Sequence, residues 1–223
     1  MRKLLGILLF LVTMTVANAQ RNYTFNYCFE YISTKTAVDK PTVLYQFTNS
    51  EDNSYLLQVW EKDSLTFELQ LIDERGKLGK SRISKTAFNT AGNIILPCES
   101  VYNYSNPYRK NQLRDYEFIK LVDTLLDGRL LKHYQLSYKN SARAKRKSIG
   151  TIHYIIKNGT EFHQPVVLPR SSAFALWDAR RNIPNGVYAH QYMIMQDGAK
   201  ECRMDLVKYA KTAKTVILQE CKK

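Results

Sequence analysis

The strongest constraint on the fold is an alternation of period two that runs through much of the chain. Aromatic residues occupy every second position near the start, and polar residues such as Thr24 and Glu30 stand between them. Successive side chains of a strand point to opposite faces, so this pattern predicts a strand with one aromatic face. We interpret that face as core, with the lining of an apolar cavity as the alternative. Its residues are Tyr23, Phe25, Tyr27, Phe29 and Tyr31.

The same alternation returns in shorter segments that turn residues separate. It predicts a meander of neighbouring strands with turns at residues 50–53 and 63–64, and a tight turn at Asp127-Gly128. Residues 74–115 are less regular, and we expect mainly turns and exposed loops there. In all, the pattern predicts about ten strands.

The clearest hairpin signal is Asn158-Gly159, because this pair tolerates the positive φ angles of a type I′ turn. It predicts strands over residues 152–157 and 160–167. A short turn is expected near Lys211-Thr212. Further strands are predicted at residues 187–195, 202–209 and 215–220.

One helix is predicted after the hairpin. Ser171 or Ser172 can cap its first turn, residues 173–177 give it an apolar side, and Pro184 ends it. A large sheet tends to curl, because strand twist accumulates and open edges are a liability. The sequence therefore predicts a mainly β (α+β) protein: a single antiparallel, strongly curved sheet or incomplete barrel with one short helix.

Residues 1–19 have the three parts of a secretory signal peptide: a basic start, an apolar run and an A-x-A cleavage site. Cleavage is expected between Ala19 and Gln20. The apolar run is too short to span a bilayer comfortably, and no stop-transfer segment follows. We therefore expect an exported protein that does not span the membrane, with residues 20–223 forming a single β-rich domain.

The chain is strongly basic, with a net charge of +13, which favours anionic partners. One basic stretch between two predicted strands is our candidate contact for an anionic lipid or an acidic glycan, and a solvated loop is the alternative. Nucleic acid is not expected as a partner, because export removes it and the aromatic residues belong to strand faces. The candidate anion contacts are Arg143, Lys145, Arg146 and Lys147.

All four cysteines lie beyond the expected cleavage site, and an even number in an exported chain predicts disulfide bonds. Three pairings are possible. The expected turn near Lys211-Thr212 would place Cys202 opposite Cys221, so we predict a bond between these two and another between Cys28 and Cys98. No C-x-x-C spacing and no cysteine at the cleavage site are present, which argues against a redox site, a zinc ribbon and a lipid anchor.

No motif for catalysis, metal binding or cofactor binding is found. The predicted hairpin places His153 and His163 on opposite faces, so they cannot share a metal ion, and no H-E-x-x-H or G-x-S-x-G spacing occurs. We interpret these histidines, with His133 and His190, as strand residues at a wet face of the sheet. We therefore expect no catalytic residue, metal or cofactor, and an enzyme is the less expected class.

The chain resembles uncharacterised exported proteins of Bacteroidetes in its signal peptide, its Tyr-, Asn- and Lys-rich strands and its residues 47–55. This resemblance covers most of the mature chain and implies no known activity. Two tripeptides, residues 63–65 and 123–125, resemble the O-glycosylation acceptor of that phylum. No sorting domain of the phylum's outer-membrane secretion route is evident at the C-terminus, so the resemblance favours the periplasm over the medium.

Export, a curled sheet, an aromatic face and positive charge together favour a non-enzymatic envelope protein that binds a lipid or another amphiphile. Two alternatives remain open: a structural or interaction module with a filled core, and a hydrolase whose site is assembled from dispersed residues. A large apolar cavity would favour the first function, and a solid core with an exposed apolar patch the second. A polar cleft with perturbed carboxylates or a histidine would favour the third. The sequence specifies neither the ligand nor the oligomeric state.

Overall fold

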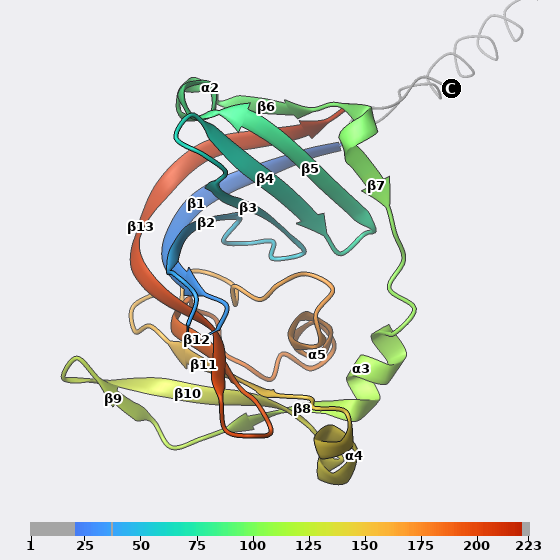
Figure 1. The fold of residues 1–223 in the computed structure, drawn as a ribbon, viewed down its shortest axis with the longest axis vertical. Helices are drawn as coiled ribbons and strands as arrows, with labels where there is room; N and C mark the ends of the chain where they lie inside the picture. The colour runs from blue at the N-terminus through green and yellow to red at the C-terminus, as the bar shows by residue number, and fades with distance from the viewer. Residues whose placement is uncertain (1–20, 37, 220–223) are drawn as a thin grey trace, which may run out of the picture.

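The computed structural model describes residues 21–36 and 38–219, and a strongly bent sheet dominates it (Figure 1). The predicted signal peptide and its cleavage site lie outside the described residues. The sheet has 13 strands: β1 (Arg21–Thr34), β2 (Thr42–Thr48), β3 (Tyr55–Glu61), β4 (Thr66–Asp73), β5 (Lys77–Ser84), β6 (Asn93–Leu96), β7 (Val101–Asn103), β8 (Tyr116–Lys120), β9 (Thr124–Leu126), β10 (Arg129–Tyr138), β11 (Thr151–Ile156), β12 (Tyr188–Ile194) and β13 (Lys200–Leu218).

Neighbouring strands follow the order β7-β5-β4-β3-β2-β1-β13-β12-β11-β10-β8, with β6 on β13 and β9 on β10. The pairings are antiparallel except for the parallel pair of β6 and β13. The order ends at β7 and β8, so the sheet is not closed into a barrel. The predicted fold class, mainly β with a single, strongly curved antiparallel sheet, is confirmed.

More helices are present than the one predicted. The described residues contain α2 (Lys85–Thr90), α3 (Arg109–Asp115), α4 (Ser141–Arg146), α5 (Ser172–Arg180) and the short 3-10 turn η2 (Cys98–Ser100). α2 and α3 are short and lie with β5, β6 and β7 in residues 74–115, where loops were expected. Within the described part of the chain, no helix is long and apolar enough to cross a membrane.

The strand β2 is buried on both faces, and it separates two hydrophobic cores. Tyr45 and Phe47 pack in the first core, whereas Leu44 packs in the second. Gln46 and Thr48, which share a face with Leu44, are only 2% and 3% exposed. Because alternate residues of a strand point to opposite faces, the two cores lie on opposite faces of β2.

The aromatic stripe of β1 is divided between these two cores. Tyr23 and Phe25 belong to the first core, and Phe29 and Tyr31 to the second. The register against β13 shifts between Phe25 and Tyr27, where β13 has an extra residue. A shift of one residue exchanges the faces of a strand. The interpretation of the stripe as core is thus confirmed, but the single aromatic face is wrong.

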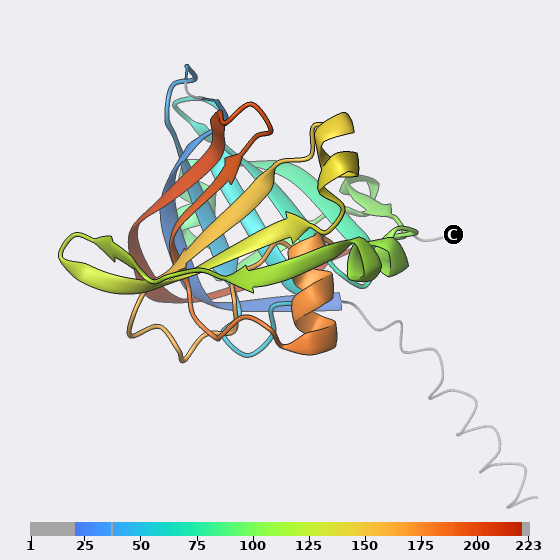
Figure 2. The ribbon, with the colours of Figure 1, turned by 90° about the horizontal axis from the view of Figure 1, so that it is seen from below.

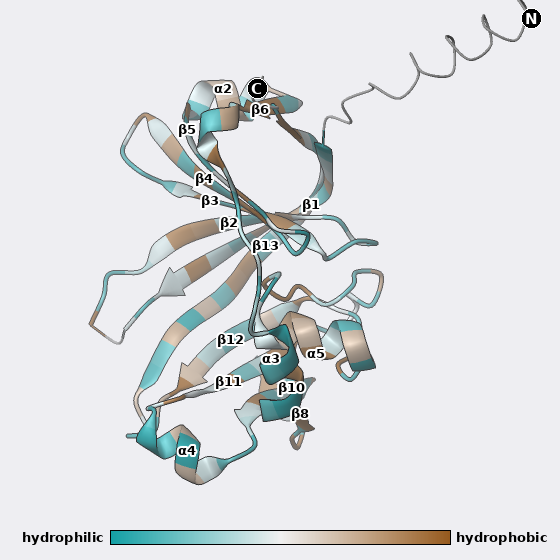
Figure 3. Ribbon diagram, turned by 90° about the vertical axis from the view of Figure 1, so that its right-hand side faces the viewer, coloured by the Kyte–Doolittle hydropathy of each residue, from teal (hydrophilic) through white to brown (hydrophobic). Residues whose placement is uncertain are grey.

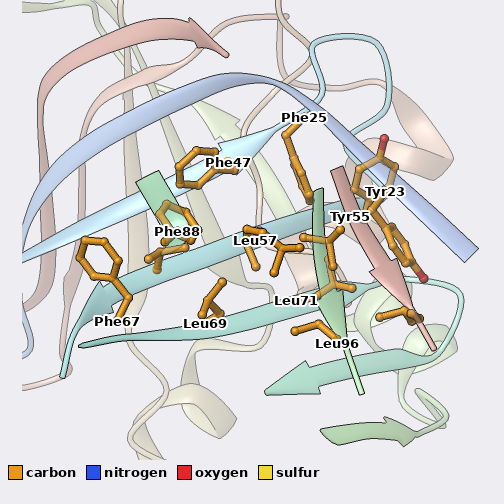
Figure 4. Close-up of a cluster of buried hydrophobic side chains, with 14 residues drawn as sticks. Tyr23, Phe25, Phe47, Tyr55, Leu57, Phe67, Leu69, Leu71, Phe88 and Leu96 are labelled. Carbon is orange, nitrogen blue, oxygen red and sulfur yellow. The ribbon is translucent and has the colours of Figure 1, made fainter. Parts of the chain in front are cut away.

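Side chains fill the first core. Figure 4 shows them pointing toward one another from β1, β2, β3, β4, α2 and β6. The ring of Phe88 meets Phe47 and Phe67 edge to face, with centroids 5.5 Å and 5.3 Å away. On the far side, a Cβ on Gly79 would lie 2.7 Å from Leu96 Cδ1. This half of the sheet therefore wraps tightly around its core, so that β5 approaches β6.

The second core lies between β1, β2, the lower strands β8 and β10–β12, and α5. The predicted helix is confirmed as α5, and Ser171 is its cap: its Oγ accepts a hydrogen bond from Phe174 N at 3.1 Å. The helix ends at Arg180, earlier than Pro184, because Arg181 takes a left-handed conformation with φ 49°. α5 lies inside the bend of the sheet (Figure 1) and contacts α3 and β8, which Figure 2 shows from below.

The predicted hairpin at Asn158-Gly159 is wrong in its second strand. The turn is present, with Gly159 at φ +75°, but residues 160–167 form no strand. The partners of β11 are β10 and β12 instead. Side-chain and backbone bonds to a distant turn hold the segment after Gly159: Gln164 N donates to Ser50 O at 2.9 Å.

The predicted disulfide pairing is also wrong. Cys28 and Cys202 carry free thiols, and each of the two predicted pairs contains one of them. The expected turn near residue 211 is absent because β13 runs unbroken from Lys200 to Leu218, so Cys202 does not begin a C-terminal hairpin. Cys98 is disulfide-bonded. Cys221 lies outside the described residues.

Candidate functional site

The face of β3 and β4 that points away from the first core borders two hollows. We call the first, of about 770 Å³, the Trp60 hollow, and the second, of about 530 Å³, the Arg170 hollow. Both volumes fall within the range of about 300–1,000 Å³ that is common for ligand pockets.

Neighbouring strands contribute to the linings of the two hollows. Gln58 of β3 lines the Trp60 hollow, and Gln70 of β4 lines the Arg170 hollow. These two residues are direct cross-strand partners, so their side chains share one face of the sheet. The next pair along the same face, Leu56 and Ile72, is 2% and 6% exposed. We refer to the two hollows together as the groove.

The Trp60 hollow combines an apolar floor with a charged rim. Val43, Leu44 and the half-buried Trp60 line it, and the exposed Lys35 and Lys62 stand at its edge. An apolar surface next to cationic side chains suits a molecule with one apolar and one polar part.

Asp63, an acidic residue at the same rim, forms hydrogen bonds within the protein. Asp63 Oδ1 accepts hydrogen bonds from the backbone N–H groups of Leu65 and Thr66, at 2.9 Å and 2.8 Å, and Oδ2 accepts one from Thr66 Oγ1 at 2.6 Å. These bonds, above all that from the Thr66 hydroxyl, lower the pKa of the Asp63 carboxyl. Its charge therefore stabilises the β3–β4 turn.

The Arg170 hollow lies between β4–β5 and the segments that precede α3 and α5. Ile72 and Leu78 give it apolar walls, and Tyr104 and Arg170 give it an aromatic ring and a charge. The guanidinium of Arg170 lies over the ring of Tyr104. Arg170 is 8% exposed, which is rare for a charged side chain.

The segment between Asn158 and α5 is fastened to the turn between β2 and β3. Asn53 Nδ2 donates to Pro165 O at 3.0 Å. His163 is 0% exposed, and its Nε2 lies 2.7 Å from Thr48 Oγ1. Because Nδ1 of His163 faces the carbonyl of Gln164, it carries the proton, and Nε2 accepts from the Thr48 hydroxyl. These bonds hold the approach to α5, and with it Arg170, in place.

The predicted anion contacts lie elsewhere. Arg143, Lys145, Arg146 and Lys147 belong to α4 or follow it directly, where a loop was one expectation. Asn140 caps this helix by accepting a hydrogen bond from Arg143 N at 2.8 Å. None of the four basic residues lines the groove, and Figure 3 shows α4 at the far end of the lower strands. Their contact with an anion stays a prediction.

The interpretation of the histidines as wet strand residues is wrong for His163 and His133, which are 0% and 9% exposed. His133 Nε2 lies 3.0 Å from His153 Nδ1, and His153 stacks on Tyr192 with 4.8 Å between the ring centroids. Burial lowers the pKa of His133, and it lowers that of His153 to about 4. Neither residue of this pair lines the groove. The described residues hold no group of three or more metal-binding side chains.

Sequence reasoning singled out neither Trp60 nor Arg170. For Trp60 a signal was present: it stands on the face of its strand opposite to Leu57 and Val59, which belong to the first core. For Arg170 there was none, because its burial depends on Tyr104 and on α3, which are distant in the sequence.

No protein-family model matches the chain, and no curated protein matches it. Among solved structures, the Pseudomonas aeruginosa MucA/MucB complex is similar with a TM-score of 0.45 and 6% identity, over 87% of this chain and 53% of that chain. A domain described as an outer membrane lipoprotein-sorting protein domain from Vibrio parahaemolyticus gives 0.27 and 7%, over 84% and 86%. A DUF1329 family protein from Desulfovibrio piger gives 0.33 and 10%, over 90% and 89%. The chain spans about half the length of the chain that it matches in the MucA/MucB complex.

Proposed function

We propose that this protein is an exported, non-enzymatic binder of a lipid or another amphiphile, which it holds in the groove. The observation that carries the proposal is the pair of hollows at the face of β3 and β4 that lies opposite to the first core, where Gln58 and Gln70 pair across the two strands. Their apolar walls fit an acyl chain or a similar group, and their charged residues fit a polar head. Periplasmic location is part of the proposal and depends on the predicted signal peptide.

The contrast between the two faces of the upper strands supports this choice of site. The face that points into the first core is filled by side chains of Leu57, Leu69 and Leu71, each 0% exposed. The opposite face carries the partly exposed Trp60 and Gln58, and farther along it the buried Leu56 and Ile72. A ligand that occupies the groove would cover apolar surface without displacing any part of a packed core.

The two tryptophans of the chain allow a direct test. Trp60 lines the groove, whereas Trp177 is 4% exposed within the second core. Bromine atoms on an acyl chain quench tryptophan fluorescence on contact. We expect bromopalmitate to quench the wild-type protein saturably, and unbrominated palmitate to reverse the quenching. The variant Trp60→Phe, which keeps Trp177, should lose most of this signal. Quenching that is absent from the wild type, or equal in both proteins, would contradict binding in the groove.

A second candidate function, an interaction module without a ligand, is favoured by one feature. The hairpin of β9 and β10 projects from the body (Figure 2) and exposes the cross-strand pair of Leu125 and Leu130, at 73% and 59%. Exposed apolar patches often mark protein contacts. Native mass spectrometry of protein purified from a bacterial periplasm without detergent separates the two functions. A lipid-sized adduct supports the binder, and a bare mass supports the module.

A further inference from the structure

Arg170 is a buried cation whose hydrogen-bonding capacity is largely unused. Its Nε and Nη1 atoms are buried and have no hydrogen-bond partner among the described residues, and the side chain is 8% exposed. A buried charge is costly unless it is paired and hydrogen-bonded, and native proteins rarely leave such donors without an acceptor. The side chain also lines the Arg170 hollow. An acceptor that enters the hollow would satisfy these donors.

The nearest carboxylates do not supply this acceptor. Glu74 pairs through Oε1 with Arg109 Nη1 and also interacts with the backbone N–H of Arg170. Its Oε2 has no hydrogen-bond partner among the described residues, so the carboxylate is not bonded to the guanidinium of Arg170. Asp73 Oδ2 accepts a hydrogen bond from Tyr23 Oη at 2.8 Å. Both carboxylates act on Arg170 through space, and burial nevertheless lowers the pKa of its guanidinium. They offset part of its charge and leave its donors free.

The backbone holds Arg170 at the wall of the hollow. The residue has a left-handed conformation with φ 69°, which is uncommon for a residue other than glycine. Its carbonyl oxygen accepts hydrogen bonds from Asn106 Nδ2 at 3.3 Å and Gln112 Nε2 at 3.2 Å. Ser171, the next residue, caps α5 and also lines the hollow. The positive end of this nine-residue helix thus lies beside the guanidinium, and both favour an anion.

We propose that the Arg170 hollow binds the anionic headgroup of the amphiphile, a carboxylate or a phosphate, while the Trp60 hollow takes its apolar chain. This assignment rests on the proposed function and names the class of ligand. A planar guanidinium is the side chain best suited to carboxylate and phosphate oxygens. The path between the two ends runs past Gln70 and Gln58, which pair across the neighbouring strands β4 and β3.

The test compares ligands that share a chain and differ in the head. Palmitate, hexadecyl phosphate and the neutral hexadecanol compete with bromopalmitate for the groove, with quenching of Trp60 as the readout. We expect the wild type to bind an anionic probe about tenfold or more tightly than hexadecanol, the scale of a hydrogen bond to a charged group. Arg170→Gln should remove this preference, because it weakens the binding of the anionic probes much more than that of hexadecanol. The ratio of palmitate to hexadecyl phosphate identifies the headgroup.

Two kinds of control keep the result interpretable. Arg146→Gln removes the same charge from α4, outside the groove, and should keep the preference. Arg170→Lys retains a positive charge near Tyr104 and should keep part of the preference for anionic probes. Circular dichroism and the thermal midpoint show whether each variant is folded.

The outcomes separate the two proposals. If the wild type binds none of the probes, the proposed function fails. If it binds all of them equally, only the headgroup assignment fails. If Lys35→Gln with Lys62→Gln abolishes the preference while Arg170→Gln does not, the headgroup lies at the Trp60 end and the assignment is overturned.

Discussion

At the scale of single residues, Asp73 fastens the start of β1 to the end of β4. It is 1% exposed, its Oδ2 accepts from Tyr23 Oη at 2.8 Å, and its Oδ1 accepts from Arg75 N at 2.8 Å. Burial and the neighbouring carboxylate raise the pKa of Tyr23 well above its ordinary value. Tyr23 therefore stays protonated and donates its hydroxyl proton to Asp73.

Replacing Asp73 by alanine leaves the Tyr23 hydroxyl without a partner in the interior. We expect Asp73→Ala to lower the free energy of unfolding by about 1–3 kcal/mol, the usual penalty for an unsatisfied buried group. Urea denaturation measures the change. The double variant with Tyr23→Phe should cost less than the sum of the two single changes, because the hydroxyl and its acceptor are then both absent. Strict additivity would show that the bond contributes nothing.

The role of a residue could be predicted from the sequence only where the alternation of neighbouring residues determines it. The aromatic residues of β1 were recognised as core because alternation alone marks them. His163 and Arg170 were not assigned, because their burial depends on partners far along the chain, such as Thr48 and Tyr104. The periodicity of a sequence does not reveal contacts between residues that are far apart in the chain.

At the scale of elements, the N-cap residue determines where α5 begins. The sequence allowed either of two serines, and the structure identifies Ser171, whose Oγ accepts from Phe174 N at 3.1 Å. We expect Ser171→Ala to lower the free energy of unfolding by about 1 kcal/mol, and Ser171→Asn, which can cap equally well, to restore it. Chemical denaturation followed by circular dichroism provides the measurement. Equal stability of the alanine variant and the wild type would contradict a capping role.

Elements bounded by strong turn residues could be predicted, whereas those held by distant contacts could not. The meander from β1 to β4 was predicted because its turns at residues 50–53 and 63–64 are marked by polar residues that bond their own backbone. β6 was not predicted, since its parallel partner β13 lies far away in the sequence. β13 was divided in two because its bulges resemble breaks in the alternation.

At the scale of the whole molecule, the bend of the sheet creates the groove. The upper strands enclose the first core, and the lower strands cover α5, so the face of β3 and β4 opposite to the first core stays only partly covered. The mainly β class and the curvature followed from strand number and alternation, since a large twisted sheet must curl. The division into two cores did not follow, because it depends on a register shift at Phe25 that alternation does not reveal.

The whole molecule should also lose stability in acid, and the pKa values of three histidines determine the pH range in which this happens. Burial lowers the pKa values of His133, His153 and His163 from the ordinary 6.5, to about 4 for His153. Between pH 6.5 and about 4 the unfolded chain therefore binds more protons than the folded one, so the free energy of unfolding falls as the pH falls. Protonated His163 would bury a charge beside Thr48, and it contributes at most about 1.4 kcal/mol per pH unit. Urea denaturation at a series of pH values should show this slope in the wild type and a shallower one in His163→Gln. The same slope in both proteins would exclude His163 as a source of the acid sensitivity.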